Sequence, residues 1–527
     1  MRRPVAILAL LLVLAGAARA AAPELAVEVA RLHADLDAWA VTAAGPAIER
    51  LHGQHPDSPA VQQLTGRYAF LRGEYGRAVT LLAQARRQSQ PPRGEDLLAL
   101  ATATRDLVGG YQRVALEPVH LYVAPGTPDR ILAPYAAAVV AAQVEALRAD
   151  LGWTPDLPLR VEILPDPRTL GRITGLTESA IETSGTIAVA KFNKLMLISP
   201  RALVRGYGWQ DTLGHELTHL ALSQVSRNTA ALWLQEAVAK TLEARYRTPL
   251  AEVELAPRNR HLLALAGASG KLLSFASLNP SFAYLPSQES AALAYAQVWS
   301  LLQMLLAEQG VAGLQRLIGE LATGAPEDQA LRAVYGAGFH GLVARWKQYL
   351  KRQKLQPQPG LAEFGLEFAA EGVDPEKRER ARIEDRKVRD HLTLGDLLYA
   401  RGRHRAAGVE YGRARSRTAE VLPLIQRRLA RALVEAGEPA RAAAELDRAL
   451  ELYPRHPALL VDRAGLALAA EERERARDLF EQVVAINPFD PRSHAALATL
   501  YHAAGREAEA RREHEVLTVL KTWLEER

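Results

Sequence analysis

The 527-residue sequence contains no cysteine. The absence of thiols excludes disulfides, cysteine nucleophiles, thiolate metal sites and a lipid-modified cysteine near the amino terminus. An oxidising compartment permits disulfides without requiring them, so the absence of cysteine does not argue against export. Any catalysis or metal binding must therefore use other side chains.

Long hydrophobic runs are also scarce, and the run nearest the amino terminus covers only Val5–Ala15. Arg2 and Arg3 precede this run, and the small-x-small sequence Ala18-Arg19-Ala20 follows it, which is the pattern of a signal peptide. We therefore expect residues 1–20 to direct export and the mature protein to be periplasmic or secreted. An uncleaved membrane anchor is the alternative, although so short a run would not span a bilayer comfortably. No other run is long enough, so we expect no stable membrane insertion after cleavage.

A large excess of charge of one sign is lacking too. The 65 basic and 60 acidic residues give a formal charge of +5, which falls to +2 without residues 1–20, because that segment holds three arginines and no acid. We therefore expect no nucleic-acid partner. The hydrophobic content of 48% and charged content of 24% are those of folded material. The length favours three or four domains.

Residues 391–524 carry a repeat of 34 residues, and the repeated positions are Pro423, Pro457 and Pro491, and Ala442, Ala476 and Ala510. Glycines precede the alanines by five residues in two copies, and Gly402 with Ala407 marks an earlier copy. This period, with a small residue at the helix contact, is the tetratricopeptide signature. We predict four units stacked in one solenoid. Its function could be to bind a protein partner or, equally, to pack against the rest of the chain or hold a dimer.

Residues 24–110 are also expected to be helical, and Val61–Arg87 is similar to a tetratricopeptide helix pair interrupted at Gly73. An ordinary helical hairpin is the alternative, because it would have the same pattern. Between this region and the solenoid, we place residues 353–390 as a linker and a charged helix. The acids and bases that alternate over Glu376–Asp390 are typical of a solvated helix face.

Residues 111–352 have a different sequence pattern, in which short strand-like runs alternate with helical stretches. Short strand-like runs at His120–Val123 and Leu159–Leu164 flank an Ala-rich helical stretch, and Gly185–Pro200 contains two β-like runs joined by a polar turn. A mainly helical portion follows. We expect a small mixed α/β lobe ending in a hairpin, followed by a helical lobe, within a mainly α multidomain protein.

The chemistry centres on the sequence H-E-L-T-H. In a helix, His215 and His219 stand one turn apart on one face and can reach a single ion, while Glu216 projects beside them. Glu236 follows after enough residues for a loop and a returning helix, which makes it the candidate third ligand of a zinc ion. The alternative is a chance motif whose histidines are hydrogen-bonded inside a helical core. This alternative is unfavourable, because the neighbouring leucines would bury the two histidines and the acid, and burying charged groups without partners costs free energy.

These motifs resemble those of the gluzincin metallopeptidases, which have a thermolysin-like catalytic domain. More narrowly, residues 111–352 resemble the bacterial peptidase-MA-like family, whose ordered motifs here read H-E-L-T-H, W-L-Q-E-A-V-A, A-Y-A-Q and Y-G…W. The resemblance implies that His215, His219 and Glu236 bind zinc. It also implies that Glu216 acts as general base toward the attacking water.

Other roles follow from the same resemblance. Tyr295 would donate a hydrogen bond to the developing oxyanion, although a packing role is as plausible, and His340 is a weaker candidate. Glu243 would hydrogen-bond a ligand histidine, or form an ion pair with Lys240 or Arg245. Either Thr186–Ala190 or its partner strand Leu195–Ser199 would form the sheet edge to which an extended peptide substrate adds.

Two departures from the family pattern bear on activity. Ala237 stands where the family usually has glycine, and no G-A-M-E-N-like sequence precedes the His215 helix. The second absence argues against an aminopeptidase, so we expect an exported zinc endopeptidase acting on peptides or proteins, with a protein partner held by the repeats. The alternative is a periplasmic tetratricopeptide scaffold whose peptidase-like lobe is catalytically idle.

Overall fold

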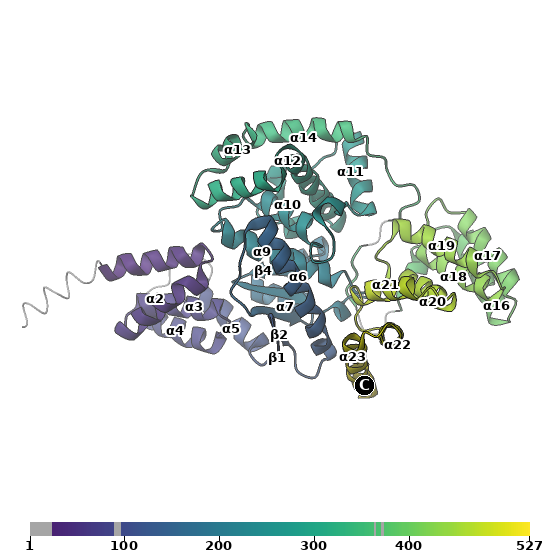
Figure 1. Ribbon diagram of the computed structural model, residues 1–527, viewed down its shortest axis with the longest axis horizontal. Coiled ribbons are helices and arrows are strands. Elements are labelled where there is room, and N and C mark those ends of the chain that lie inside the picture. The colour runs from purple at the N-terminus through teal and green to yellow at the C-terminus, as the bar shows by residue number, and fades with distance from the viewer. Residues whose placement is uncertain (1–23, 89–95, 363–364, 370–373, 527) are drawn as a thin grey trace, which may run out of the picture.

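The computed structural model describes residues 24–88, 96–362, 365–369 and 374–526. The expected signal peptide, residues 1–20, lies outside the described residues and stays a prediction. The chain is a mainly helical multidomain protein with one small mixed sheet. In Figure 1, N-terminal helices lie on one side of the central sheet and helices, and the C-terminal helical repeats lie on the other.

The N-terminal region is helical, as predicted. Its described helices are residues 24–37, α2 (Val41–Gln54), α3 (Pro59–Leu71), α4 (Tyr75–Gln88) and α5 (Leu97–Val108). α3 and α4 form the expected hairpin, and Gly73 between them has a positive φ of 77°. This region contacts the central sheet through buried polar groups, because the Tyr75 hydroxyl bonds to Glu162 and accepts a 2.8 Å hydrogen bond from Lys194.

The sheet has five strands in the order β1-β2-β3-β5-β4. The strands are β1 (Gln112–Leu116), β2 (Val119–Val123), β3 (Leu159–Leu164), β4 (Ala188–Lys191) and β5 (Lys194–Ile198). β2, β3 and β5 are parallel, while β1 and β4 are antiparallel to their neighbours. β1 was not expected, because its sequence Q-R-V-A-L is mostly exposed and lacks a clear apolar alternation.

β4 forms one edge of the sheet, whereas β5 lies between β3 and β4. Of the two segments considered from the sequence as the edge strand, Thr186–Ala190 is therefore the one at the edge. The only strand partner of β4 among the described residues is β5. Phe192 and Asn193 connect the two strands with positive φ angles of 58° each, as in a tight hairpin turn. The β4–β5 hairpin is therefore present as predicted, with β4 as an edge strand.

Helices cover the sheet and continue into a helical lobe, with bounds α6 (Ala133–Leu151), α7 (Pro167–Thr174), α8 (Glu178–Ser184), α9 (Trp209–Val225), α10 (Leu232–Leu242), α11 (Pro257–Ser269), α12 (Gln288–Ala322), α13 (Glu327–Tyr335) and α14 (Phe339–Gln353). α6 packs against β1 and β2, and α9 packs against β4, β5 and α6. The helix that carries H-E-L-T-H is therefore seated on the sheet beside its edge strand.

Two helical segments of the described chain are long and apolar enough to cross a membrane by length and composition. They are Pro128–Leu151 and Gln288–Ala322. The expectation that no apolar segment after the amino terminus is long enough to cross a membrane was therefore wrong. In each, 61% of the apolar window is buried inside the protein. Core helices pass the same test, so we interpret both segments as core helices.

The linker region differs from the single solvated helix that the charge pattern suggested. Two separate helices are present, α15 (Pro375–Ala381) and α16 (Arg386–Ala400). Glu379 on α15 is buried, where it accepts a 2.7 Å hydrogen bond from the Leu424 amide and forms an ion pair with Arg205 at 3.1 Å. This carboxylate can leave solvent because charged and polar partners from other elements replace water.

The four predicted repeat units are four helix pairs, formed by α16, α17 (His404–Ser416), α18 (Pro423–Glu435), α19 (Pro439–Leu452), α20 (Pro457–Ala469), α21 (Arg473–Val484), α22 (Pro491–Ala503) and α23 (Glu507–Glu525). The repeated prolines begin α18, α20 and α22, where a missing amide costs nothing. The repeated alanines are buried at the contacts within the pairs. The solenoid prediction is therefore confirmed.

The solenoid packs directly against the central domain. The Trp209 indole at the start of α9 donates a 3.1 Å hydrogen bond to the Val484 carbonyl, and the Tyr207 amide donates one of 3.1 Å to the Ile486 carbonyl. Tyr135 on α6 donates a 2.7 Å hydrogen bond to Glu513 on α23. One buried apolar cluster includes side chains from the sheet, the helical lobe and α20 to α23. Packing against the rest of the chain, one of the roles considered for the repeats, is thus present.

Candidate metal centre

The candidate site lies where α9 and α10 face one another. Leu213, Leu217 and Leu220 are buried and hold α9 in the core, so the opposite helix face presents its histidines toward α10. The chain turns back just after α9, where Arg227 and Asn228 have positive φ angles of 55° and 61°. α10 then runs back past α9, and this turn places Glu236 beside the two histidines.

Three ligand atoms converge at this point. The Nε2 atoms of His215 and His219 are 3.1 Å apart, and each lies 3.5 Å from Oε2 of Glu236. Zinc bonds of about 2.0–2.1 Å at tetrahedral angles would separate neighbouring ligand atoms by about 3.3 Å. Oε2 of Glu236 is buried without a conventional hydrogen-bond partner. The geometry and this buried oxygen both fit a small divalent cation bound by the three side chains.

The charges within the group are strongly coupled. Burial would raise the pKa of Glu236, but the neighbouring His219 and His215 lower it to about 2. Burial would lower the pKa of His215, but the neighbouring carboxylates of Glu236 and Glu243 raise it to about 10. The carboxylates therefore create a strongly cation-attracting environment at the histidine nitrogens.

Outer hydrogen bonds orient both histidines. Oε2 of Glu243 lies 3.3 Å from Nδ1 of His215, and its other oxygen accepts a 2.6 Å hydrogen bond from Lys240. Glu243 thus makes both contacts that were considered for it with His215 and Lys240. Gln235 was not anticipated from the sequence, and its Oε1 lies 3.3 Å from Nδ1 of His219. These contacts turn each Nε2 toward Glu236.

Glu216 is buried next to the ligand group. Burial is the largest effect on its carboxyl and raises the pKa, while the nearby His219, His215 and a backbone hydrogen bond with Ala190 oppose that rise. Ala190 belongs to the edge strand β4. The carboxylate therefore lies between the candidate metal ligands and the sheet edge.

Tyr295 also reaches the site. The Tyr295 ring packs edge-on against His215 with centroids 5.9 Å apart, and Phe282 packs on it at 5.0 Å. Burial, together with the charges of Glu236 and Glu216, raises its pKa well above the usual value, so the phenol keeps its proton at neutral pH. His340 is exposed on α14. Tyr295 can thus act as a hydrogen-bond donor.

Two residues that the sequence analysis did not single out hold α9 against α10. The Gln143 amide donates hydrogen bonds of 3.3 Å to the Thr218 hydroxyl and 2.8 Å to the Leu242 carbonyl. Gly214 allows the two helices to approach, because a Cβ there would lie 2.1 Å from the Glu243 carbonyl oxygen. A glycine within an otherwise helical pattern was the available signal for such a contact.

Replacing Gly214 by alanine should destabilise the protein by about 1–3 kcal/mol, because a backbone carbonyl cannot move aside as a flexible side chain can. Thermal and denaturant unfolding would measure the change. Gly319→Ala on α12 is the matched control, since a Cβ there meets nothing within 4 Å. Equal stability of the two variants would contradict the proposed close contact.

Replacing Glu243 by glutamine should weaken zinc binding by about 10-fold to 100-fold, because His215 would lose its carboxylate partner. Competition with a chromogenic chelator would measure the affinity. Glu252→Gln, an exposed acid of the same region, is the control and should have no effect. An unchanged affinity in Glu243→Gln would show that this carboxylate does not support the ligand.

Comparison with known proteins agrees with this geometry. Residues 141–352 match the Peptidase MA superfamily, and residues 433–500 match the tetratricopeptide repeat. The chain therefore contains a peptidase MA superfamily domain followed by tetratricopeptide repeats, as the sequence motifs indicated. The repeat match does not include α3 and α4, so the tetratricopeptide character of that pair stays a prediction.

No curated protein matches the chain. Among solved structures, it is similar to a chain in the crystal structure of the APC/C hetero-tetramer Cut9-Hcn1, with 14% identity and 94% of each chain covered. The TM-score is 0.24. A likeness this low supports no conclusion about fold or function.

Proposed function

We propose that this protein is an exported zinc-dependent endopeptidase. The observation that carries the proposal is the triangle of ligand atoms formed by His215, His219 and Glu236, with Glu216 buried beside it. The Peptidase MA match over the same helices supports a metallopeptidase. Zinc is the preferred metal because two imidazoles and one carboxylate are a common catalytic zinc ligand set.

A zinc ion held there would polarise the scissile carbonyl and make a water molecule more acidic. Glu216 would accept the proton of the attacking water and later transfer it to the leaving amine. Its raised pKa favours this exchange, because the protonated form is reached more easily than for an exposed carboxyl. Tyr295 would donate a hydrogen bond to the carbonyl oxygen as that oxygen gains negative charge.

The edge strand β4 would bind the substrate backbone. An extended peptide would pair with backbone groups on the unpaired side of β4 other than those of Ala190, whose backbone is bonded to Glu216. An extended chain added there would pass the general base. The absence of an amino-terminus recognition motif favours cleavage within a chain, and the repeats would recruit protein partners or substrates.

Metal removal tests the proposal. Full-length protein should contain about one zinc per chain and should cleave a denatured protein substrate. A chelator should abolish cleavage, and added zinc should restore it. The competing hypothesis is a tetratricopeptide scaffold with an idle peptidase lobe, which predicts no cleavage at any zinc concentration. Absence of zinc, or cleavage that survives its removal, would contradict the proposed function.

A further inference from the structure

The first helices of three successive repeat pairs lie side by side and form one face of the solenoid. Arg428 on α18 pairs with Asp396 on α16 at 3.6 Å, and Arg427 on α18 pairs with Asp462 on α20 at 2.7 Å. Solenoids of stacked helix pairs use an extended face of this kind to bind other molecules. We call this surface the first-helix face and define it by Thr393, Asp396, Arg427, Arg428, Val461 and Asp462.

A segment of the chain itself already lies on this face. α15, the helix of seven residues in the linker before the repeats, contacts α18. Glu376 on α15 accepts hydrogen bonds of 2.9 Å from Arg427 and 2.6 Å from Arg428. Arg380, one turn later on α15, donates a 2.8 Å hydrogen bond to Asp396. The linker helix therefore joins α16 and α18 through charged side chains.

The second glutamate of α15 adds to this contact. Glu379 accepts the 2.7 Å hydrogen bond from the Leu424 amide, at the positive end of α18, and pairs with Arg205 from the loop before α9. Glu376 and Glu379 are three residues apart, so both project from one side of α15. The repeats thus bind two carboxylates that lie one helical turn apart.

Charged groups, rather than apolar side chains, hold α15 on the face. The only buried side chain of α15 is that of Glu379, and the nearest apolar anchor is Ile383, two residues after the helix. Glu376, Arg428 and Asp396 keep 36%, 29% and 32% of their side-chain surface exposed. Ion pairs exposed to this degree contribute only about 0–1 kcal/mol each. A competing segment with the same charges could therefore replace α15.

α15 covers only part of the first-helix face. Thr393, Arg427 and Val461 are 34 residues apart and occupy corresponding positions of successive repeats. Arg380 and Glu376 of α15 bond to the first two of these residues. Val461, the third, lines a cavity of about 240 Å³ together with α15 and Arg427. A segment longer than α15 would have room at this third position.

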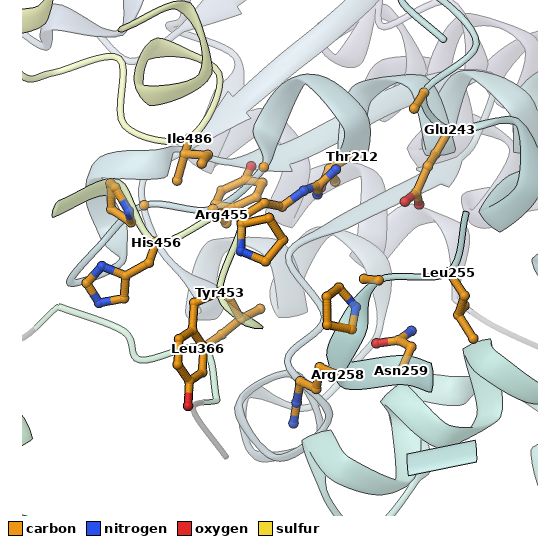
Figure 2. Close-up of a pocket in the computed structure, with 18 of the residues that line it drawn as sticks. Thr212, Glu243, Leu255, Arg258, Asn259, Leu366, Tyr453, Arg455, His456 and Ile486 are labelled. Atoms are coloured by element: carbon orange, nitrogen blue, oxygen red, sulfur yellow. The ribbon is translucent and has the colours of Figure 1, made fainter. Parts of the chain in front are cut away.

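The open part of the face lies toward the peptidase domain. Arg205 and His456 line the cavity beside α15 and also line a larger cavity, of about 660 Å³, between the peptidase domain and the repeats. Figure 2 shows this larger cavity, with Arg455 and His456 from the repeats and Thr212 from α9 around it. A longer segment bound on the face would therefore reach the boundary between the two domains.

We propose that α15 is an internal ligand of the repeats, which covers the first-helix face of α16 and α18 until a partner segment replaces it. The partner is a protein with a helical segment that carries two carboxylates three residues apart, because these are the groups of α15 that the repeats bind. The inference rests on the proposed recruitment of partners by the repeats and does not depend on the zinc chemistry.

Binding of a separate peptide to the full-length protein tests this proposal. The probe is a fluorescent peptide of residues 374–383, and fluorescence anisotropy measures its affinity. The wild-type protein should bind it weakly, because a ligand within the same chain competes at a high effective concentration. The double variant Glu376→Gln with Glu379→Gln should bind it about tenfold more tightly, because the weakened internal ligand leaves the face free in more molecules.

Two further substitutions in the double variant test where the peptide binds. Adding Arg427→Gln should weaken binding about tenfold, as expected for the loss of a hydrogen bond to a charged group. Arg441→Gln, an exposed arginine on α19 outside the face, is the control and should have no effect. Equal affinity of the wild-type protein and the double variant, or no binding by the double variant, would overturn the inference.

Hydrogen exchange on the wild-type protein provides a second measurement that needs no substitution. Unlabelled peptide, added well above its measured Kd, should increase the exchange of the α15 amides and leave that of α17 unchanged. Unchanged exchange of α15 would show that this helix is a fixed part of the repeats. Because neither measurement involves zinc or cleavage, a negative result here is distinguishable from failure of the proposed peptidase activity.

Discussion

Replacing Glu216 by glutamine should reduce peptide hydrolysis by about 10³-fold and leave the zinc content unchanged. Glutamine keeps the size and most of the polarity of the side chain but cannot accept the proton of the attacking water, and general base catalysis contributes about 10²-fold to 10⁴-fold. The variant should remain folded, because the buried carboxyl already has a raised pKa and its neutral form is tolerated there.

The rate would be measured on a denatured protein and on a fluorogenic peptide, with zinc determined on the same samples. Glu182→Gln is the matched control, because this acid is exposed on α8. Hydrolysis at the wild-type rate by Glu216→Gln would exclude Glu216 as the base. A loss of zinc together with activity would instead assign Glu216 a structural role in the metal centre.

Replacing Glu236 by glutamine should lower zinc affinity by more than 100-fold, which exceeds the effect of removing an outer hydrogen-bond partner. The carboxylate is the only anionic ligand of the three, and both histidine Nε2 atoms lie 3.5 Å from its Oε2 atom. Its loss also removes the charge that stabilises cations at this point.

Equilibrium dialysis against zinc at several concentrations would measure this loss. Glu320→Gln on α12 provides the control, since this acid is exposed and distant from the ligands in sequence. Hydrolysis should fall in proportion to the zinc occupancy and recover in part at high zinc. Wild-type affinity in Glu236→Gln would show that a different residue completes the site.

The repeats and the metal group were the most predictable parts of the molecule. A period of 34 with proline at each first helical position fixes the order of α18, α20 and α22. Likewise, the one-turn spacing of His215 and His219 fixes their common face as soon as the segment is helical. Both inferences depend only on local periodicity, which a sequence displays directly.

Features that depend on distant contacts were not predictable. Glu379 belongs to a charged run that looks solvated, yet Arg205 and the Leu424 amide bury it. Gln235 and Gln143 carry no motif, and their roles follow from where α9, α10 and α6 meet. Such contacts pair residues far apart in the chain, so no local pattern records them.

The contact between α9 and the repeats is the clearest example of this limit. From the sequence, the solenoid was a separate module that could bind a partner or pack against the chain. The structure shows Arg455, in the loop between α19 and α20, ion-paired with Asp211 in the first turn of α9. Packing against the peptidase domain is therefore one role of the repeats, and partner binding stays a prediction.

Zinc-edge X-ray absorption on the full-length wild-type protein tests the central claim most directly. The account predicts about one zinc per chain, bound by nitrogen and oxygen atoms at about 2.0–2.1 Å with the multiple-scattering signal of two imidazoles. A protein without stoichiometric zinc, or with zinc whose spectrum lacks histidine, would contradict it.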